Sequence, residues 1–182
     1  ILVLGSQGQL GLCLADQFRG LEYEVVFANR NQIDLSDLEH TKSKIIETNP
    51  EVVINAAAYT AVDKAEEDFE EATLINTTAV ANLASVCKKM GIWLIHISTD
   101  YVFDGLSNKP YTENDIPNPK SVYGRSKLDG ENEIQNLDSY YLIIRTAWVF
   151  SEYRNNFVKT MLKLSDTNNE ISVVSDQFGC PT

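Results

Sequence analysis

"ILVLGSQGQLG", residues 1–11, joins a short apolar run to three glycines at intervals of three residues. Gly5 can form a tight turn, Gly8 lets the backbone approach a pyrophosphate, and Gly11 lets a helix pack closely on a strand. A phosphate would then lie at the helix N-terminus, where unpaired N–H groups attract an anion. Three glycines also fit an ordinary strand-to-helix turn, so the interpretation depends on the rest of the chain.

Short β-branched runs alternate with longer helical patterns after this stretch. Continuous apolar strands separated by helices predict a parallel sheet covered by helices on both faces. This is the doubly wound α/β architecture of Rossmann-type NAD(P)-binding domains, in which ligands bind at the carboxyl ends of the strands. The predicted strands are residues 1–5, 24–28, 52–56, 93–98, 141–147 and 171–174, and the predicted helices are residues 9–19, 37–48, 69–90, 122–136 and 155–165.

The composition indicates a soluble globular protein and argues against several classes. The formal charge of −11 disfavours a nucleic-acid surface, and no apolar run approaches the roughly 18 residues that span a bilayer. Cys13, Cys87 and Cys180 lack disulfide or zinc spacing and predict reduced thiols in a cytoplasmic protein. His40 and His96 are too few for a metal site, and His96 is expected to be a satisfied core residue. No metal ligands are predicted, and the sequence decides neither a magnesium requirement nor whether the protein is a homodimer.

The last stretch, "SDQFGCPT" (175–182), follows a predicted strand without a closing helix or a polar tail. A complete protein of this architecture would continue beyond such a point. We therefore expect residues 1–182 to be an NAD(P)-binding domain that carries the catalytic residues. On this expectation, most of a C-terminal substrate-binding lobe is missing.

The end of the second predicted strand, "ANRNQ" (28–32), bears on cofactor choice. NAD-binding domains place a carboxylate here to bind the ribose hydroxyls, whereas this chain has Arg30 nearby. Arg30 can pair with a 2′-phosphate, which favours NADPH over NADH, although a solvated arginine is the alternative. Asp34 can reach an adenine amino group or serve in a turn or helix cap.

Polar and small residues follow the third and fourth predicted strands. "NAAAYTAVDKAEED" (55–68) begins with alanines that let a flat cofactor lie on the backbone or let a helix pack closely. Asn76, in the following helix, is either a structural amide or a polar group that supports the site. "STDYVFDG" (98–105) gathers Ser98, Thr99 and Asp100 where a hydroxyl could bond a substrate carbonyl. Ordinary loop chemistry gives the same pattern.

"YGRSKLDGE" (123–131) places Tyr123 and Lys127 one helical turn apart, so both project from the same helix face. Chance or surface packing often gives such a pair. A hydroxyl at the end of the fourth strand combined with Tyr-x-x-x-Lys on the next helix is much more specific.

These residues resemble the extended branch of the short-chain dehydrogenase/reductase superfamily, and within it the dTDP-4-dehydrorhamnose reductases. The similar stretches cover nearly the whole chain: "GSQGQLG", "NAAAYTAVDKAE", "STDYVFDG", "YGRSKLDGE", "RTAWVF", "NNFVKTML" and "SDQFGCPT". The resemblance implies NADPH-dependent reduction of the 4-keto group of dTDP-4-dehydro-6-deoxy-L-mannose to dTDP-L-rhamnose. Such an oxidoreductase serves the synthesis of cell-surface polysaccharide such as O-antigen lipopolysaccharide.

The resemblance also implies roles for individual residues. Thr99, Tyr123 and Lys127 would be the catalytic set, and Trp148 would line the sugar pocket with Thr99 and Asp100. Tyr123 and Lys127 would contact the cofactor as well, and Lys127 would hold its nicotinamide ribose. The remaining cofactor contacts would come from Gly8, Gln9, Leu10, Asp34, Leu35, Ala58, Tyr59 and Thr60.

Elementary chemistry makes the catalytic set coherent. A free phenol has a pKa of about 10, and a nearby Lys127 ammonium is expected to lower the pKa of Tyr123. Tyr123 would then protonate the carbonyl oxygen, and Thr99 would bond the same oxygen.

One departure from the family pattern is Arg154, where a small turn residue such as glycine is expected.

Two other classes remain open. A non-catalytic NADP-binding regulatory subunit, as in the methionine adenosyltransferase β subunit, shares this resemblance, but it could lose Tyr123 and Lys127 without harm. A nucleotide-sugar epimerase or dehydratase would retain its NAD. Such dehydratases place an acid pair after the strand-four threonine, whereas here Tyr101 follows Asp100.

Overall fold

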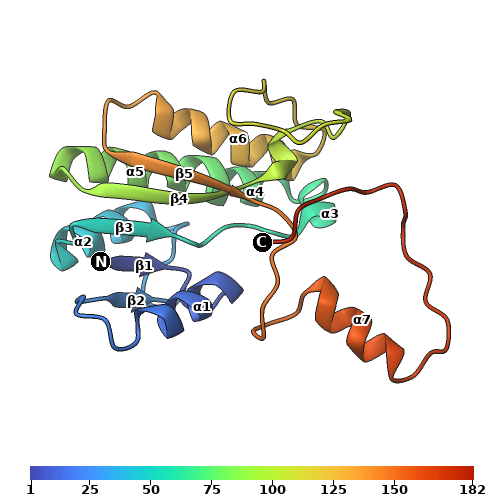
Figure 1. The fold of residues 1–182 in the computed structure, drawn as a ribbon. Coiled ribbons are helices and arrows are strands. Elements are labelled where there is room, and N and C mark those ends of the chain that lie inside the picture. Colours follow the sequence, from blue (N-terminus) through green and yellow to red (C-terminus); the bar gives the residue numbers. More distant parts are fainter.

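A computed structural model describes all 182 residues, and its centre is a five-stranded parallel sheet (Figure 1). The strand order β2-β1-β3-β4-β5 confirms the doubly wound α/β architecture, because the chain reverses direction across the sheet after β1 and β2. All neighbouring strands pair in parallel register. The strands are β1 (Leu2–Leu4), β2 (Val26–Ala28), β3 (Val52–Asn55), β4 (Trp93–Thr99) and β5 (Tyr141–Thr146).

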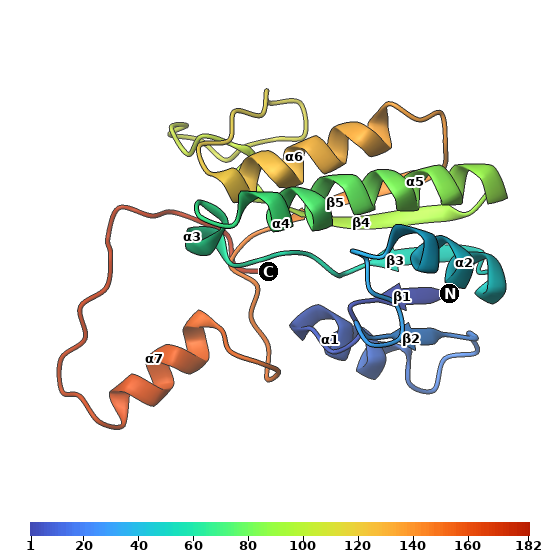
Figure 2. The same cartoon turned by 180° about the vertical axis from the view of Figure 1, so that it is seen from behind.

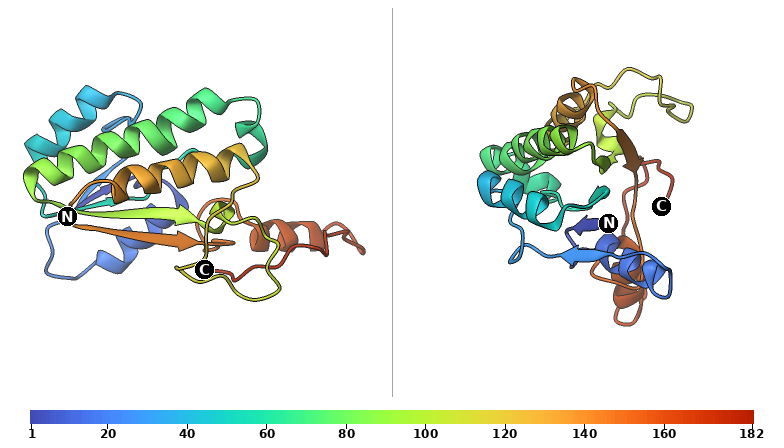
Figure 3. Two further views of the ribbon diagram at one scale, coloured as in Figure 1. Left: turned by 90° about the horizontal axis from the view of Figure 1, so that it is seen from above. Right: turned by 90° about the vertical axis from the view of Figure 1, so that its left-hand side faces the viewer.

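The helices divide between the two faces of the sheet. Three long helices lie along one face in Figure 3, and α1 lies on the other face near β1 and β2. Asp37 caps the N-terminus of the helix Leu38–Thr48, and Ser121 caps the N-terminus of the helix Val122–Gln135. In each case the side-chain oxygen accepts a hydrogen bond from a backbone N–H of the first turn. The helices are α1 (Gln9–Phe18), α2 (Leu38–Thr48), α3 (Val62–Ala65), α4 (Phe69–Thr73), α5 (Ala79–Met90), α6 (Val122–Gln135) and α7 (Phe157–Ser165).

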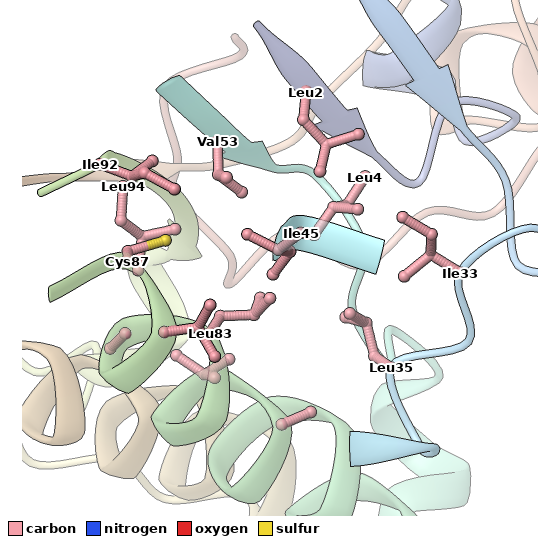
Figure 4. Close-up of a cluster of buried hydrophobic side chains, with 14 of the residues drawn as sticks. Leu2, Leu4, Ile33, Leu35, Ile45, Val53, Leu83, Cys87, Ile92 and Leu94 are labelled. Atoms are coloured by element: carbon pink, nitrogen blue, oxygen red, sulfur yellow. The ribbon is translucent and has the colours of Figure 1, made fainter. Parts of the chain in front are cut away.

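The main core lies between the sheet and helices α2 and α5 (Figure 4). Leu2, Leu4 and Val53 project from the strands toward Ile45 of α2 and Leu83 of α5, and all five are fully buried or nearly so. Parallel strands covered in this way are apolar along their whole length, which explains the unbroken apolar runs of the sequence. This core fixes the carboxyl ends of β1, β3 and β4 relative to one another.

The predicted helix 69–90 is interrupted. A π-helical turn, η1 (Leu74–Thr78), separates α4 from α5. Its wider turn directs the Asn76 amide inward, where it bonds the main chain of Tyr59 and the hydroxyl of Ser126. Hydrophobic periodicity does not reveal such a turn, because the residues on both sides keep a helical pattern.

The predicted strand 171–174 is wrong. Residues 166–182 form an extended segment without regular structure, which follows α7 and stands away from the sheet in Figures 1 and 2. A strand needs a neighbour for its backbone groups, and this segment meets the sheet region only at its end. There Thr182 exchanges main-chain hydrogen bonds with Ala147 and Phe150.

The prediction that helices cover both faces of the sheet fails at β5. Leu142 and Ile144 project from one face of this strand and are 49% and 39% exposed. The opposite face carries Ile143, which packs against the main core.

None of the helices is both long and apolar enough to cross a membrane.

Candidate functional site

The glycine-rich loop lies between β1 and α1, as the sequence predicts. Gly5 has a left-handed φ of 78°, and a Cβ there would lie within 3.0 Å of the backbone that follows β3. A Cβ on Gly11 would lie 2.4 Å from the Gly5 carbonyl oxygen, so this glycine permits the close approach of α1. Gly8 caps α1 without any side-chain hydrogen bond, which leaves the N–H groups of Gln9 and Leu10 without a side-chain cap.

This loop fits a dinucleotide pyrophosphate. Backbone N–H groups at the start of a ten-residue helix attract an anion, and the glycines keep side chains away from it. The backbone of Ala56 and Ala57 closes one side of the loop. The first two alanines after β3 therefore lie directly beside the glycine-rich loop.

Arg30 and Asp34 lie after β2 and pair with each other. The Arg30 Nε lies 3.1 Å from the Asp34 carboxylate, and its Nη2 lies 3.6 Å from Glu71. Asp34 also accepts hydrogen bonds from the N–H and hydroxyl of Ser36, so it has the turn role that was one of its two alternatives. The side chain of Leu35 is buried in the main core, which leaves only its main chain to face a ligand.

The loop after β3 is held by Asn76. Its amide both donates to the Tyr59 carbonyl and accepts from the Tyr59 N–H, each at 3.0 Å. Ala58 and Thr60 flank this fixed residue, and Thr60 is exposed. Asn76 is therefore a buried structural amide, and it orients a loop at the carboxyl edge of the sheet.

Thr99 and Tyr123 lie at the carboxyl end of β4 and in the first turn of α6. The Thr99 hydroxyl bonds the Asp100 carboxylate and accepts from the Tyr101 N–H, each at 3.2 Å. The ring of Tyr101 packs edge-to-face on that of Tyr123, with 5.6 Å between centroids. Burial raises the pKa of Tyr123, and the neighbouring Thr99 hydroxyl lowers it in part. Burial likewise raises the pKa of Asp100.

Lys127 is fully buried and points toward β4. Its Nζ donates to the Ile97 carbonyl oxygen at 2.7 Å and lies 3.2 Å from Nε2 of His96. Burial lowers the pKa of Lys127 to about 8. The pKa of Tyr123 is raised rather than lowered, contrary to the expectation from the sequence, because burial is the largest influence on it. The Lys127 head group is bound to β4.

Two charged residues behind Lys127, Glu131 and Arg145, were not predicted from the sequence. Glu131 of α6 is fully buried and accepts two hydrogen bonds from Arg145 of β5, at 3.0 and 2.6 Å. Arg145 also lies over the ring of Phe103, 4.9 Å from its centroid. The i, i+4 spacing of Lys127 and Glu131 was a usable signal, because it places both on the face that carries Tyr123.

His96 and its strand neighbour Asn55 are also buried beneath the site. The prediction that His96 is a satisfied core residue is confirmed, since both its ring nitrogens have polar neighbours. Ser98, one of the polar residues predicted at the strand end, is buried, and its hydroxyl has no hydrogen-bond partner.

Trp148 lies after β5, away from the core. It is 44% exposed, with a left-handed φ of 48°, and packs on Phe157 and against Gly179. Its position suits the lining of a surface site better than a core role.

The loop that follows Trp148 reaches the glycine-rich loop. Arg154 donates to the Gln7 carbonyl oxygen at 2.7 Å, and Asn156 donates to the Gln9 side chain at 3.0 Å. Tyr153 bonds Asp16 of α1. Arg154 has a φ of 56°, which explains physically why a glycine is expected there.

The predicted site residues thus gather at the carboxyl edge of the sheet, although not in one cluster. Tyr123 and Thr99 are adjacent, the glycine-rich loop lies across β3 from them, and Trp148 follows β5. Arg30 lies toward the β2 side. This is the edge at which parallel α/β sheets bind ligands.

The comparisons agree with this geometry. A dTDP-4-dehydrorhamnose reductase from Sinorhizobium fredii is 46% identical over 182 residues, which are 100% of this chain and 61% of that protein. The crystal structures of two further dTDP-4-dehydrorhamnose reductases, from Clostridium acetobutylicum and from Bacillus anthracis, each match with a TM-score of 0.96. They are 44% and 39% identical, and each match covers 100% of this chain and 64% of the solved chain. The Bacillus anthracis enzyme was solved in complex with NADP.

The chain spans 61% to 64% of the length of these relatives. Within that span the chain has the strand order and the glycine-rich turn that the sequence predicts. The family model described as RmlD substrate binding domain matches residues 1–182 without remainder. The chain therefore belongs to the RmlD substrate-binding domain family.

Proposed function

We propose that residues 1–182 are the cofactor-binding and catalytic part of an NADPH-dependent reductase. Its reaction would convert the 4-keto group of dTDP-4-dehydro-6-deoxy-L-mannose into the alcohol of dTDP-L-rhamnose. The observation that carries the proposal is the placement of the glycine-rich loop, Thr99 and Tyr123 at one edge of the sheet. A 46% identity to a reductase of that name supports the substrate class.

Ketone reduction requires a hydride at carbon and a proton at oxygen. A reduced nicotinamide supplies the hydride when it is bound. Tyr123 would donate the proton, since burial raises the pKa of its phenol and keeps it protonated at neutral pH. Thr99, next to the phenol, would turn its single hydroxyl proton from Asp100 to the same oxygen and donate a second hydrogen bond there. Lys127 would hold the nicotinamide ribose and assist the phenol.

The substrate contacts are assigned to Asp100, Thr99 and Trp148. Asp100 and Thr99 share a hydrogen bond at the end of β4, and Trp148 presents an exposed ring at the end of β5. We assign most of the nucleotide-sugar pocket to the part of the relatives' length that lies outside this match. A cytoplasmic location and a role in cell-surface polysaccharide synthesis follow from the same proposal, and homodimer formation is compatible with it.

The first test follows the near-ultraviolet absorbance of NADPH with the full-length protein. The dTDP-4-keto-6-deoxy sugar and the 3,5-epimerase together provide the substrate. We expect Tyr123→Phe to lower kcat by roughly 10²- to 10⁴-fold without weakening NADPH binding, since only the proton donor is removed. Tyr140→Phe is the matched control, because Tyr140 is exposed, lies just before β5 and stacks on Trp93 at the start of β4, at the end of the sheet opposite to Tyr123.

The outcomes separate the alternatives. Turnover that survives Tyr123→Phe would contradict the assignment of the acid. Tight NADPH binding without turnover of any keto sugar would favour a non-catalytic regulatory subunit. A protein that keeps NAD bound and converts one nucleotide sugar into another would favour an epimerase or dehydratase.

The preference for NADPH is assigned to Arg30. Its guanidinium is exposed and pairs with the carboxylates of Asp34 and Glu71. Because a guanidinium has five N–H donors, some of them remain for a 2′-phosphate. We expect Arg30→Gln to raise the KM for NADPH about tenfold and to leave the KM for NADH unchanged. Arg19→Gln is the control, because Arg19 is equally exposed and pairs only with Asp16. Equal effects on both cofactors would remove Arg30 from the 2′-phosphate site.

A further inference from the structure

A row of buried polar groups crosses from β3 through β4 to α6. Asn55, His96 and Lys127 are each at most 1% exposed, and Asn55 lies beside His96 in the strand register. Nδ2 of Asn55 lies 3.1 Å from Nδ1 of His96, and Nε2 of His96 lies 3.2 Å from Nζ of Lys127. The row connects the interior of the sheet to a member of the proposed catalytic set.

The orientation of the Asn55 amide is fixed by the backbone. Its Oδ1 accepts a hydrogen bond from the Ala57 N–H at 3.1 Å, and an N–H requires an oxygen there. Nδ2 of Asn55, a donor, must therefore face His96. Because a donor needs an acceptor, Nδ1 of His96 carries no proton, and the proton of the neutral ring lies on Nε2.

This tautomer constrains Lys127. The Nε2–H of His96 points at Nζ, which can accept a hydrogen bond only as a neutral amine with a free lone pair. The amine still donates to the Ile97 carbonyl oxygen at 2.7 Å, so every group in the row is satisfied. An ammonium at the same place would require a proton on Nδ1 of His96, and two donors would then face each other across 3.1 Å.

We propose that His96, oriented by Asn55, is a positioning residue that selects between two forms of Lys127, a neutral amine bound to β4 and an ammonium released toward the reaction site. The inference deepens the proposed function, because the ammonium is the form that would serve the ribose and Tyr123. Protonation of Lys127 and departure from His96 are then a single linked event.

The charges around Lys127 agree with this arrangement. Glu131 on the same helix raises the pKa of Lys127, but its carboxylate is shared with Arg145 of β5, and burial is the larger effect. Burial, with the nearby Lys127, lowers the pKa of His96 well below its ordinary value, so the ring stays neutral. Tyr123, one turn earlier on α6, is also kept neutral by burial. Lys127 is thus the group in this row whose charge changes near pH 8.

The test reads protons directly by NMR on the full-length protein without cofactor or substrate. Histidine ring nitrogens and lysine side chains are isotope-labelled, and Lys127→Arg and His96→Gln assign the two signals. We expect His96 to carry its proton on Nε2, without titrating between about pH 6 and about pH 9. Lys127 should titrate near the pKa of about 8 that burial gives it. A proton on Nδ1 of His96, or a Lys127 that titrates at its ordinary pKa, would overturn the proposal.

Asn55→Asp is the decisive variant because it keeps the size of the side chain. One carboxylate oxygen can still accept the hydrogen bond from the Ala57 N–H. The other oxygen would accept a hydrogen bond from an Nδ1–H of His96. The ring proton should move to Nδ1, Nε2 should become an acceptor, and the pKa of Lys127 should rise by more than about one unit. An unchanged tautomer in a folded Asn55→Asp protein would overturn the proposal.

His96→Gln keeps the proposal testable if Asn55→Asp does not fold. The glutamine carbonyl oxygen can accept from an ammonium, so the pKa of Lys127 should again rise, and an unchanged pKa would count against His96. His40→Gln, at the only other histidine, should leave the signal of Lys127 in place. Because no measurement uses turnover, failure of the reductase activity and failure of this inference are distinguishable.

Discussion

α6 and α7 both neighbour predicted site residues, but only α7 carries an apolar face, whereas the buried face of α6 includes Ser126, Lys127 and Glu131. α6 buries seven of its fourteen residues against η1, α5 and β4, whereas α7 buries none of its nine. Phe157 and Leu162 of α7 are more than half exposed. The comparison teaches that an amphipathic pattern specifies a helix but not its position, which comes from buried partners on other elements.

The consequence for the site is a division between fixed and less supported residues. Tyr123 and Lys127 lie on a helix that is held on several sides, and Thr99 ends a strand of the core. Trp148 and Arg154 lie in a segment that is joined to the rest of the domain by a few hydrogen bonds, to the glycine-rich loop, to Asp16 of α1 and to Thr182. Substitutions in the two regions should therefore differ in size and in kind.

The largest difference is expected at the Glu131–Arg145 pair. Glu131→Leu should lower the free energy of unfolding by about 3–5 kcal/mol, because the Arg145 guanidinium loses its two charge-assisted bonds in a mostly buried position. Urea denaturation measures the change. Glu47→Leu is the matched control, because its pair with Lys44 on α2 is exposed and should contribute little to stability.

The double variant Glu131→Leu with Arg145→Met sharpens this result. If the damage comes from an unpaired buried charge, removal of Arg145 should restore most of the lost stability. A double variant as unstable as Glu131→Leu alone would show that the carboxylate itself, or the packing around it, holds α6 in place.

Lys127→Met should stabilise the protein near neutral pH while it removes the proposed activity. A pKa lowered from 10.5 to about 8 means that protonation of Lys127 is about 3 kcal/mol less favourable in the native protein than in the unfolded chain, so we expect a gain of about 1–3 kcal/mol at pH 7. The unfolded chain binds more protons than the native protein between about pH 8 and about pH 10.5, so wild-type stability rises with pH across that window. The advantage of the variant should shrink over the same window.

Urea denaturation at about pH 7 and at about pH 10 measures this pH dependence. A gain of equal size at both values would show that improved apolar packing, rather than removal of a buried charge, stabilises the Lys127→Met protein.

The smallest effect is expected at Arg154. Glycine removes the cost of a left-handed backbone at a residue with a φ of 56° but also removes the hydrogen bond to Gln7. These contributions are each on the order of 1 kcal/mol and oppose each other, so Arg154→Gly should change stability by less than about 1 kcal/mol. Thermal unfolding measures it, and a loss above about 2 kcal/mol would show that this loop is as firmly built as α6.

Much of the fold follows from the sequence because the sheet is parallel and internal. Five strands and the helices α1, α2, α6 and α7 lie within two residues of their predicted bounds, whereas the predicted helix 69–90 is interrupted. Gly5 forms the predicted turn and Gly11 the predicted close approach of helix and strand, because both functions follow from the short spacing of the two glycines. Tyr123 and Lys127 share a helix face because four residues make about one turn.

The remaining features depend on residues far apart in the chain. The direction of the Lys127 head group is set by His96 and Ile97, about thirty positions earlier, and no local pattern encodes that choice. The predicted strand 171–174 has suitable β-branched residues but no neighbouring strand. The pKa of Tyr123 was predicted from one neighbouring charge, whereas burial is the larger influence.

β5 has a practical consequence for anyone who prepares this chain in the laboratory. It is an edge strand, its outer backbone groups are unpaired, and one of its faces shows Leu142 and Ile144 to solvent. The stretch "YYLIIRTAWVF" (140–150) around it contains a single charged residue, Arg145, which is already engaged with Glu131. Long, apolar and uncharged edges pair readily with copies of themselves. Residues 1–182 expressed alone should therefore be handled as an aggregation-prone protein, with inclusion bodies and concentration-dependent turbidity as its first signs.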